Sequence, residues 1–240
     1  MTAPRLPLVL LPGLLCDHAL WRYQVEALSD IADPWIADLT NADSVEEMAH
    51  GVLAHAPERF ALAGLSMGGY VCFEIVRQAP QRVSRLALLD TKASPDSSEQ
   101  RRRRRGLLSL AGKGRFKGVT PQLLPMLLHE DRLNDARLTG IVTGMAERVG
   151  REAFIRQQTA ILARPDSRDI LPDVKAPTLV LCGKEDALTP MAEHKAMAEA
   201  IPGAELVVVP HCGHLAPLER PDAVNTAMRR WLRSGEQSHS

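Results

Sequence analysis

Six short apolar runs recur along this chain, with helix-like stretches between them. Four of these stretches have the length and apolar spacing of amphipathic helices: 45–55, 70–78, 191–200 and 223–232. Strands that alternate with helices form a mainly parallel sheet, doubly wound because helices cover both of its faces. We therefore predict an α/β fold with a sheet of about six strands, at residues 8–11, 35–39, 60–65, 86–89, 178–182 and 206–209.

The alternation is interrupted between residues 91 and 176, where the sequence indicates several helices separated by glycine and proline and predicts no strand. We predict a core domain formed by residues 1–91 and 176–240, with a helical cap, or lid, inserted at 92–175. Such a cap would exclude water and shape a pocket, whereas the alternative is that its helices only complete the core. One of them carries an apolar face made of Leu138, Ile141, Val142, Met145 and Val149.

The charge balance limits the class of partner. The 240 residues include 29 basic and 29 acidic side chains, so the formal net charge is zero. A neutral chain has no overall attraction to nucleic acid or to an anionic membrane, and a small molecule is the partner that we expect. The run of five arginines at 101–105 is typical of a solvated helix start, with a basic patch for nucleic acid or for an acidic ligand as the alternative.

The N-terminal apolar stretch at residues 6–15 follows Arg5 and superficially resembles a signal peptide. Pro7, Pro12 and Gly13 interrupt it, which favours a first buried strand followed by a turn. No apolar run reaches the length needed to cross a bilayer, so we expect a cytoplasmic protein without a membrane partner.

Four cysteines are scattered without the C-x-x-C spacing of a metal or redox motif, and we expect free thiols at Cys16, Cys72, Cys182 and Cys212. Cys212 lies between His211 and His214, but no further ligand nearby completes a tetrahedral set. We therefore expect neither a metal nor a cofactor.

The segment Gly64-Leu65-Ser66-Met67-Gly68 lies at the junction between the apolar run at 60–65 and the helix-like run at 70–78. A G-x-S-x-G pattern between a strand and a helix is typical of a sharp turn that exposes a nucleophilic serine. The glycines leave room for this strained backbone, so Ser66 is the candidate nucleophile. Because the following helix directs its N-terminal N–H groups at the serine oxygen, Met67 N–H is a candidate donor to an oxyanion.

A serine nucleophile needs a base, and histidine has a suitable pKa. His214 follows the strand at 206–209 through a short turn, which places it at the same sheet edge as Ser66. His211 is the nearest rival, and we assign it a supporting role. The other histidines are expected at the surface or in the cap: His18, His50, His55, His129, His194 and His239.

The imidazole in turn needs a carboxylate at its other ring nitrogen. Asp186 follows the strand at 178–182 in a loop expected to emerge beside that of His214. Asp90, after the strand at 86–89, is an alternative acid, although the role of an acceptor that anchors a loop fits it better. Glu185 is expected to be exposed.

The chain order Ser66, Asp186, His214 is that of the α/β-hydrolase fold and differs from the order in other serine hydrolase folds. Four segments resemble the oxyanion loop, nucleophile elbow, acid loop and histidine loop of this superfamily: 12–17, 64–69, 183–186 and 213–214. From about residue 8 to residue 232, the chain thus resembles a serine esterase of the α/β-hydrolase superfamily with a helical cap.

The resemblance implies a second oxyanion donor, the N–H of Leu14, beside that of Met67. Many members of the superfamily carry His-Gly at the start of this loop, whereas this chain has Pro12-Gly13. The hydrogen bonds that anchor the loop must therefore differ.

The resemblance also implies hydrolysis of carboxylic esters through an acyl-enzyme on Ser66. Serine at this position disfavours haloalkane dehalogenation and epoxide opening, which need an aspartate there. Carbon–carbon bond hydrolases, enol-lactonases and cofactor-free haloperoxidases or perhydrolases share the same residues and stay as alternatives, as does a ligand-binding module on a hydrolase scaffold. The chain has few aromatic residues, so we expect small, mainly aliphatic substrates in a pocket lined by Leu14, Leu15, Met67, Leu188 and Leu215.

Overall fold

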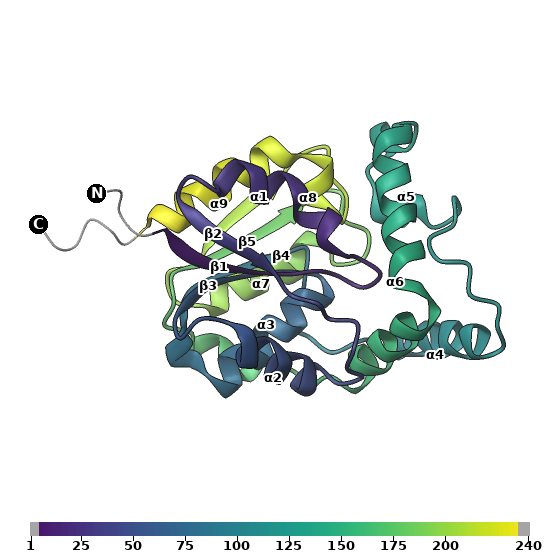
Figure 1. Ribbon diagram of the computed structural model, residues 1–240, viewed down its shortest axis with the longest axis horizontal. Coiled ribbons are helices and arrows are strands. Elements are labelled where there is room, and N and C mark those ends of the chain that lie inside the picture. Colours follow the sequence, from purple (N-terminus) through teal and green to yellow (C-terminus); the bar gives the residue numbers. More distant parts are fainter. Residues whose placement is uncertain (1–4, 235–240) are drawn as a thin grey trace, which may run out of the picture.

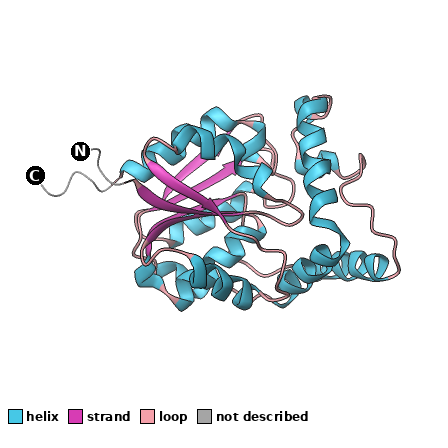
Figure 2. Cartoon of the chain, viewed as in Figure 1, coloured by secondary structure: helices cyan, strands magenta, loops and turns pink. Residues whose placement is uncertain are grey.

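The computed structural model describes residues 5–234, whose six strands form one parallel sheet in the order β2-β1-β3-β4-β5-β6. The sheet lies between two layers of helices (Figures 1 and 2). The predicted α/β architecture with a mainly parallel, doubly wound sheet is thus confirmed. The strands are β1 (Leu6–Leu11), β2 (Ala32–Ile36), β3 (Phe60–Leu65), β4 (Val83–Leu89), β5 (Thr178–Gly183) and β6 (Glu205–Val209).

Helices α1, α8 and α9 cover one face of the sheet, and α2, α3 and α7 cover the other (Figure 1). Leu8 and Leu10 of β1 pack into the hydrophobic cluster of the first face, and Val9 and Leu11 pack into that of the second. A strand buried on both faces needs apolar residues at every position, which explains the continuous runs in the sequence. The helices are α1 (Arg22–Leu28), α2 (Val45–His55), α3 (Met67–Gln78), α7 (Met191–Ala200), α8 (Ala216–Glu219) and α9 (Pro221–Arg233).

The edge strand β2 differs from the prediction, because it spans Ala32–Ile36 and not 35–39. Its register pairs residues 32–36 with β1, and Pro34 is tolerated because β2 has a free edge. Ala37 and Leu39 leave the sheet but stay buried in the core. Residues 37 and 39 are apolar because they are buried and not because they pair in the sheet. This apolar pattern moved the predicted strand toward the C-terminus, to 35–39.

Residues 92–175, all of which the structure describes, contain helices and loops and no strand, as predicted. We call this segment the insertion. It lies beyond the carboxyl ends of the strands (Figure 1), although its status as a separate cap domain stays a prediction. Its helices are α4 (Ser98–Gly112), α5 (Leu124–Leu127) and α6 (Ala136–Ala163), with short 3₁₀ helices at Glu130–Arg132 and Arg168–Asp173. Two further 3₁₀ helices lie outside the insertion, at His18–Trp21 and Pro80–Arg82.

The arginines at 101–105 lie in the first turns of α4, as predicted. Four of them are exposed, but the prediction of a solvated side chain is wrong for Arg104, which is half-buried. Arg104 lies on the same helix face as Leu108 and Ala111, since residues three to four positions apart are neighbours on a helix. That face of α4 is directed at the rest of the protein.

Candidate active site

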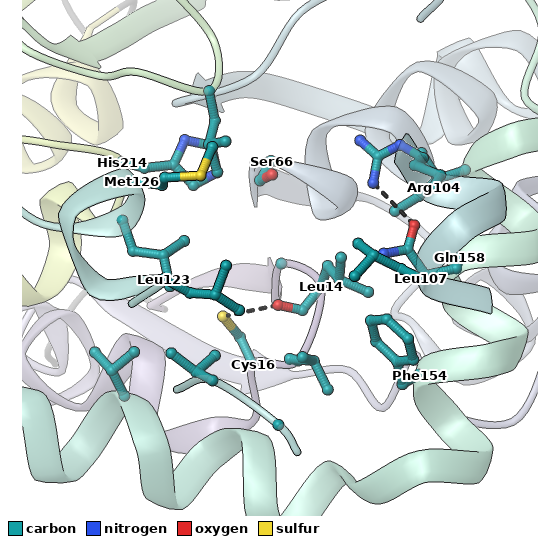
Figure 3. A pocket seen from close by; sticks show the side chains of 18 of the residues that line it. Leu14, Cys16, Ser66, Arg104, Leu107, Leu123, Met126, Phe154, Gln158 and His214 are labelled. Atoms are coloured by element: carbon teal, nitrogen blue, oxygen red, sulfur yellow. Dashed lines mark hydrogen bonds between the residues drawn. The ribbon is translucent and has the colours of Figure 1, made fainter. Parts of the chain in front are cut away.

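Ser66 lies between β3 and α3, where the G-x-S-x-G pattern predicted a sharp turn. Its φ of 53° and ψ of −113° lie in a region that residues other than glycine rarely adopt, so the turn is strained. The flanking glycines permit this packing, because a Cβ at Gly68 would overlap the carbonyl oxygen of Leu11 and one at Gly64 would overlap the carbonyl of Gly68. The turn presents Ser66 to a pocket (Figure 3).

Two buried polar residues, Thr91 and His194, support the Ser66 turn through hydrogen bonds. Thr91 Oγ1 donates a hydrogen bond of 2.8 Å to Ser66 O, and Thr91 N–H donates one of 3.0 Å to His194 Nε2. Burial lowers the pKa of His194 to about 4, so the ring is neutral and Nε2 can accept. The prediction that His194 lies at the surface or in the cap is therefore wrong. Its partner lies 103 residues away in sequence, and no local pattern reveals that contact.

Asp186 and His214 are brought together by the neighbouring strands β5 and β6. His214 Nδ1 lies 2.8 Å from Asp186 Oδ2. The N–H groups of Leu188 and Thr189 donate to Oδ1 at 2.8 Å and 3.0 Å, and Thr189 Oγ1 donates to Oδ2 at 2.6 Å. Burial acts to raise the pKa of the Asp186 carboxyl, but His214 and these hydrogen bonds outweigh it and hold that pKa below its usual range. The carboxylate is therefore ionised and held in one orientation.

Asp90 was the alternative partner for the histidine, but its carboxyl group contacts backbone N–H groups, whereas His214 Nδ1 contacts Asp186. Its Oδ1 accepts from Gly183 N–H at 2.8 Å and its Oδ2 accepts from Ala216 N–H at 3.2 Å. Burial and the charge of Asp186 raise the pKa of Asp90 well above its usual value. Asp90 thus ties the ends of β4 and β5 to the segment after His214, as expected for an acceptor that anchors loops.

Glu219 joins the histidine loop to the insertion. Its Oε2 accepts from His129 N–H at 2.7 Å, and its Oε1 accepts from Leu215 N–H at 3.1 Å. His214 N–H donates to Leu127 O at 3.0 Å, so the loop is held from the same side. Glu219 is buried, and its role could not be predicted from the sequence, because a carboxylate five residues after a histidine matches no motif.

In the turn after β1, the N–H of Leu14 has no hydrogen-bond acceptor among residues 5–234. Leu15 N–H donates to Gln157 Oε1 at 3.1 Å, and Cys16 N–H donates to the carbonyl of Gly13 at 3.1 Å. Met67 is the first residue of α3, and its N–H has no acceptor within the helix. The buried side chain of Gln157, from α6, therefore anchors the loop after β1, a contact that no sequence motif indicates.

A pocket of about 420 Å³ lies between the sheet edge and the insertion, with Ser66 and His214 on its wall (Figure 3). Of the predicted pocket residues, the structure places Leu14, Leu15, Leu188 and Leu215 in the lining of this cavity. Met67 does not line it, because its buried side chain packs in the hydrophobic core on the α2 and α3 face. The lining also departs from a purely aliphatic one, because it includes Tyr70, Phe116, Phe154 and several basic side chains.

All four cysteines are buried free thiols, as predicted.

The ligand atoms of His129, Asp131 and His211 lie within 4.8 Å of one another. Arg220 Nη2, however, donates to both carboxylate oxygens of Asp131, at 3.0 Å and 2.8 Å, so a guanidinium already neutralises this group. Among residues 5–234, no helix is both long enough and apolar enough to cross a membrane. His239, which was expected at the surface or in the cap, lies outside these described residues.

The parallel sheet, the strained serine turn and the paired aspartate and histidine define a class of protein. The chain belongs to the alpha/beta hydrolase family, whose sequence profile matches residues 8–227. It is 29% identical to RutD of Agrobacterium fabrum, provisionally named a carbamate hydrolase, over 97% of this chain and 95% of that protein. It is 27% identical to a pimeloyl-[acyl-carrier protein] methyl ester esterase of Nitrosomonas europaea, over 90% of this chain and 91% of that protein.

Solved structures show the same architecture. A thermophilic esterase from Thermogutta terrifontis is 33% identical and superposes with a TM-score of 0.85, covering 97% of this chain and 91% of that chain. An enol-lactonase from Burkholderia xenovorans LB400 superposes with a TM-score of 0.85 at 24% identity, covering 96% of this chain and 92% of that chain. The second likeness shows the fold alone. The chain is thus a member of a family of hydrolases.

Proposed function

We propose that this protein hydrolyses carboxylic esters, with Ser66 as the nucleophile, His214 as the base and Asp186 as the carboxylate that orients the histidine. The observation that carries the proposal is the 2.8 Å contact between His214 Nδ1 and Asp186 Oδ2, beside a pocket that also exposes Ser66 on its strained turn. With Nδ1–H donated to Asp186, Nε2 is left with the lone pair that a base needs. The esterases among the related proteins support the same chemistry.

In the acylation step, Ser66 Oγ attacks the ester carbonyl carbon while His214 Nε2 takes the hydroxyl proton. The N–H groups of Leu14 and Met67 donate to the oxyanion that forms, and their freedom from other acceptors suits that role. The tetrahedral intermediate then expels the alcohol, which receives the proton from the imidazolium. Ionised Asp186 stabilises the positive ring throughout.

Deacylation repeats these steps with water. His214 Nε2 takes a proton from a water molecule, and the hydroxide attacks the acyl carbonyl on Ser66. The second tetrahedral intermediate collapses, Ser66 Oγ leaves with the proton held by His214, and the carboxylic acid departs. Water and the ester are the only reactants that the proposal requires.

The test is hydrolysis of p-nitrophenyl esters, from acetate to long acyl chains, by the wild-type protein and by Ser66→Ala. We expect turnover that peaks at one chain length and a loss in kcat on the order of 10⁴- to 10⁶-fold in the variant. The melting temperature of the variant should stay close to that of the wild type, which separates catalysis from folding. Equal rates in both proteins would refute the role of Ser66.

A carbamate is the second candidate substrate, because the relative RutD is provisionally named a carbamate hydrolase. Attack by serine on a carbamate carbonyl needs the same nucleophile, base and oxyanion donors. A comparison of kcat/KM for an ester and for the carbamate with the same alcohol separates the two. Carbonyl resonance with nitrogen makes the carbamate intrinsically slower, so equal or faster carbamate turnover would favour this candidate.

A further inference from the structure

The charged side chains that line the pocket are all basic. Five contribute to its wall, and none of the lining residues is an aspartate or glutamate. The whole chain has equal numbers of basic and acidic residues, so this excess of one sign is local. The five are Lys92, Arg103, Arg104, Arg115 and Lys117.

Arg104 is the basic residue whose guanidinium is best fixed. Its Nε donates to Asp96 Oδ2 at 2.6 Å, and its Nη1 donates to Gln158 Oε1 at 2.9 Å. Gln158 is itself buried, and the two hydrogen bonds together hold the guanidinium in one orientation. Within residues 5–234, Nη2 of Arg104 donates to no acceptor, and Figure 3 shows the guanidinium directed toward the side of the pocket that holds Ser66.

Asp96 alone cannot balance the cations that surround it. Arg164 Nη2 donates to its Oδ1 at 2.9 Å, Arg104 to its Oδ2, and Lys92 Nζ lies 3.8 Å from Oδ1. The side chains of Lys92, Arg164 and Asp96 are 6%, 4% and 2% exposed, so water does little to screen them. Glu193 offsets part of this charge from outside the pocket, which leaves the wall net positive.

This charged wall is close to the nucleophile. The guanidinium carbon of Arg164 lies 4.1 Å from the centre of the Tyr70 ring, and Tyr70 lines the pocket. Tyr70 follows Ser66, the residue before α3, by four positions, which is roughly 6 Å along the helix axis. The remaining lining near Leu14 and Phe154 is apolar. A ligand that reaches from Ser66 across this lining to the basic wall therefore needs an apolar spacer.

We propose that Arg104, backed by Lys92 and Arg164 around Asp96, binds a carboxylate of the substrate, so that the ester hydrolysed is a half-ester of an aliphatic dicarboxylic acid. This inference deepens the proposed ester hydrolysis and rests on it. A planar guanidinium with a free N–H₂ edge matches a carboxylate, and the hydrogen bond between opposite charges is stronger than one between neutral groups. The ester carbonyl then lies at Ser66 and the carboxylate at the basic wall.

The first test compares kcat/KM for monoethyl adipate with that for ethyl hexanoate, which has the same acyl length and no charge. We expect the wild type to favour the half-ester by about 10- to 100-fold. Arg104→Gln should lose at least tenfold on monoethyl adipate and less than threefold on ethyl hexanoate, and Arg104→Lys should lie between. Arg102→Gln, an exposed change on the same helix, should leave both values unchanged.

Two outcomes of this test would overturn the inference while leaving ester hydrolysis intact. One is a wild type that hydrolyses the two esters equally well or prefers ethyl hexanoate. The other is an Arg104→Gln variant that loses activity on both esters in parallel, which indicates a structural role for Arg104.

A binding measurement separates this inference from the proposed function, because it needs no turnover. We expect adipate to bind the wild-type protein in isothermal titration calorimetry and to bind Arg104→Gln at least tenfold more weakly. If neither ester is hydrolysed but this pattern is seen, the carboxylate site stands and the esterase proposal fails. No binding of adipate at 10-millimolar levels, or binding of inorganic phosphate without binding of adipate, would overturn the carboxylate site.

Discussion

The loops at the carboxyl ends of the strands and the helical insertion line the same pocket, but they are built differently. Asp186 and Asp90 accept hydrogen bonds from backbone N–H groups, and Ser66 is held by backbone and by buried Thr91. The pocket wall from α4 depends on side chains instead, above all on the pair of Arg104 with Asp96. The backbone around a parallel sheet holds Ser66, Asp186 and Asp90 in place, whereas side chains that substitution can change shape the rest of the pocket.

The largest effect should follow from Asp186→Asn. The amide cannot hold His214 in the tautomer that leaves Nε2 basic, so kcat for ester hydrolysis should fall by about 10⁴-fold. The measurement is steady-state kinetics together with thermal unfolding. The melting temperature should change little, because an amide oxygen at the Oδ1 position keeps both backbone hydrogen bonds and the NH₂ group faces His214 Nδ1.

Asp90→Asn is the matched control for that substitution. The new amide loses one of two backbone hydrogen bonds, which should lower the free energy of unfolding by about 1–3 kcal/mol. We expect kcat within tenfold of the wild type. A loss in kcat as large as that of Asp186→Asn would assign the role of the acid to Asp90 instead.

The free energy of unfolding should fall at acidic pH, because the buried His194 beside the serine turn is protonated more readily in the unfolded chain. Burial lowers the pKa of this histidine from 6.5 to about 4, so the folded state resists protonation that the unfolded chain accepts. Keeping His194 neutral contributes roughly 3 kcal/mol to the free energy of unfolding. This contribution is fully present above pH 6.5 and is lost as the pH falls to about 4. Denaturant unfolding from pH 7 to pH 4 measures this loss.

The control for the pH effect is His194→Gln, which keeps an acceptor near the position of Nε2 but does not titrate. Its free energy of unfolding should fall less steeply between pH 6.5 and pH 4 than that of the wild type. Parallel pH profiles for the two proteins would show that other groups cause the loss.

A smaller effect is expected in the insertion from Gly150→Ala. Gly150 breaks α6 with φ of 75° and ψ of 179°, a conformation that costs an alanine about 1–3 kcal/mol. No atom lies within 4 Å of a Cβ placed there, so the cost comes from the backbone alone. Because the insertion shapes the pocket, KM should rise while kcat stays within a few-fold.

Gly140→Ala provides the comparison, since a Cβ there also meets no atom within 4 Å and the residue lies in the regular part of the same helix. It should stabilise the protein by up to about 1 kcal/mol. Equal effects of the two substitutions would mean that the break at Gly150 is not required.

The smallest effect should come from the ion pair that connects the two regions, Arg148 with Asp17. The Arg148 side chain is 51% exposed, and pairs of this kind contribute less than about 1 kcal/mol. Arg148→Ala should therefore lower stability only slightly more than Arg137→Ala, an exposed change in α6. A difference above 2 kcal/mol would show that the insertion is held by this contact.

The fold was predictable because its determinants are local. Buried strands such as β3 are continuous apolar runs, and α2 and α7 were predicted with the bounds that the structure has. The strand β2 was misplaced because burial without strand pairing gives the same pattern. Ser66, His214 and Asp186 could be selected as candidates because each follows a recognisable strand.

The residues that the sequence could not reveal are those whose partners are distant in the chain. Gln157 and Leu15 are 142 residues apart, and Glu219 and His129 are 90 residues apart. Arg104 looked like one member of a solvated run, because its contact with Gln158 lies 54 residues away. Composition could not predict the basic wall either, because a net charge of zero does not show how the charges are distributed over the structure.

By itself, then, the sequence determined the parallel sheet, the serine turn and the chain order of Ser66, Asp186 and His214, because periodicity and turn chemistry act over a few residues. Only the tertiary structure decided which carboxylate meets the histidine, which groups support the turn and what lines the pocket. Those choices depend on pairings between elements far apart in the chain, and each is set by burial that exists only once the sheet and the insertion have packed together.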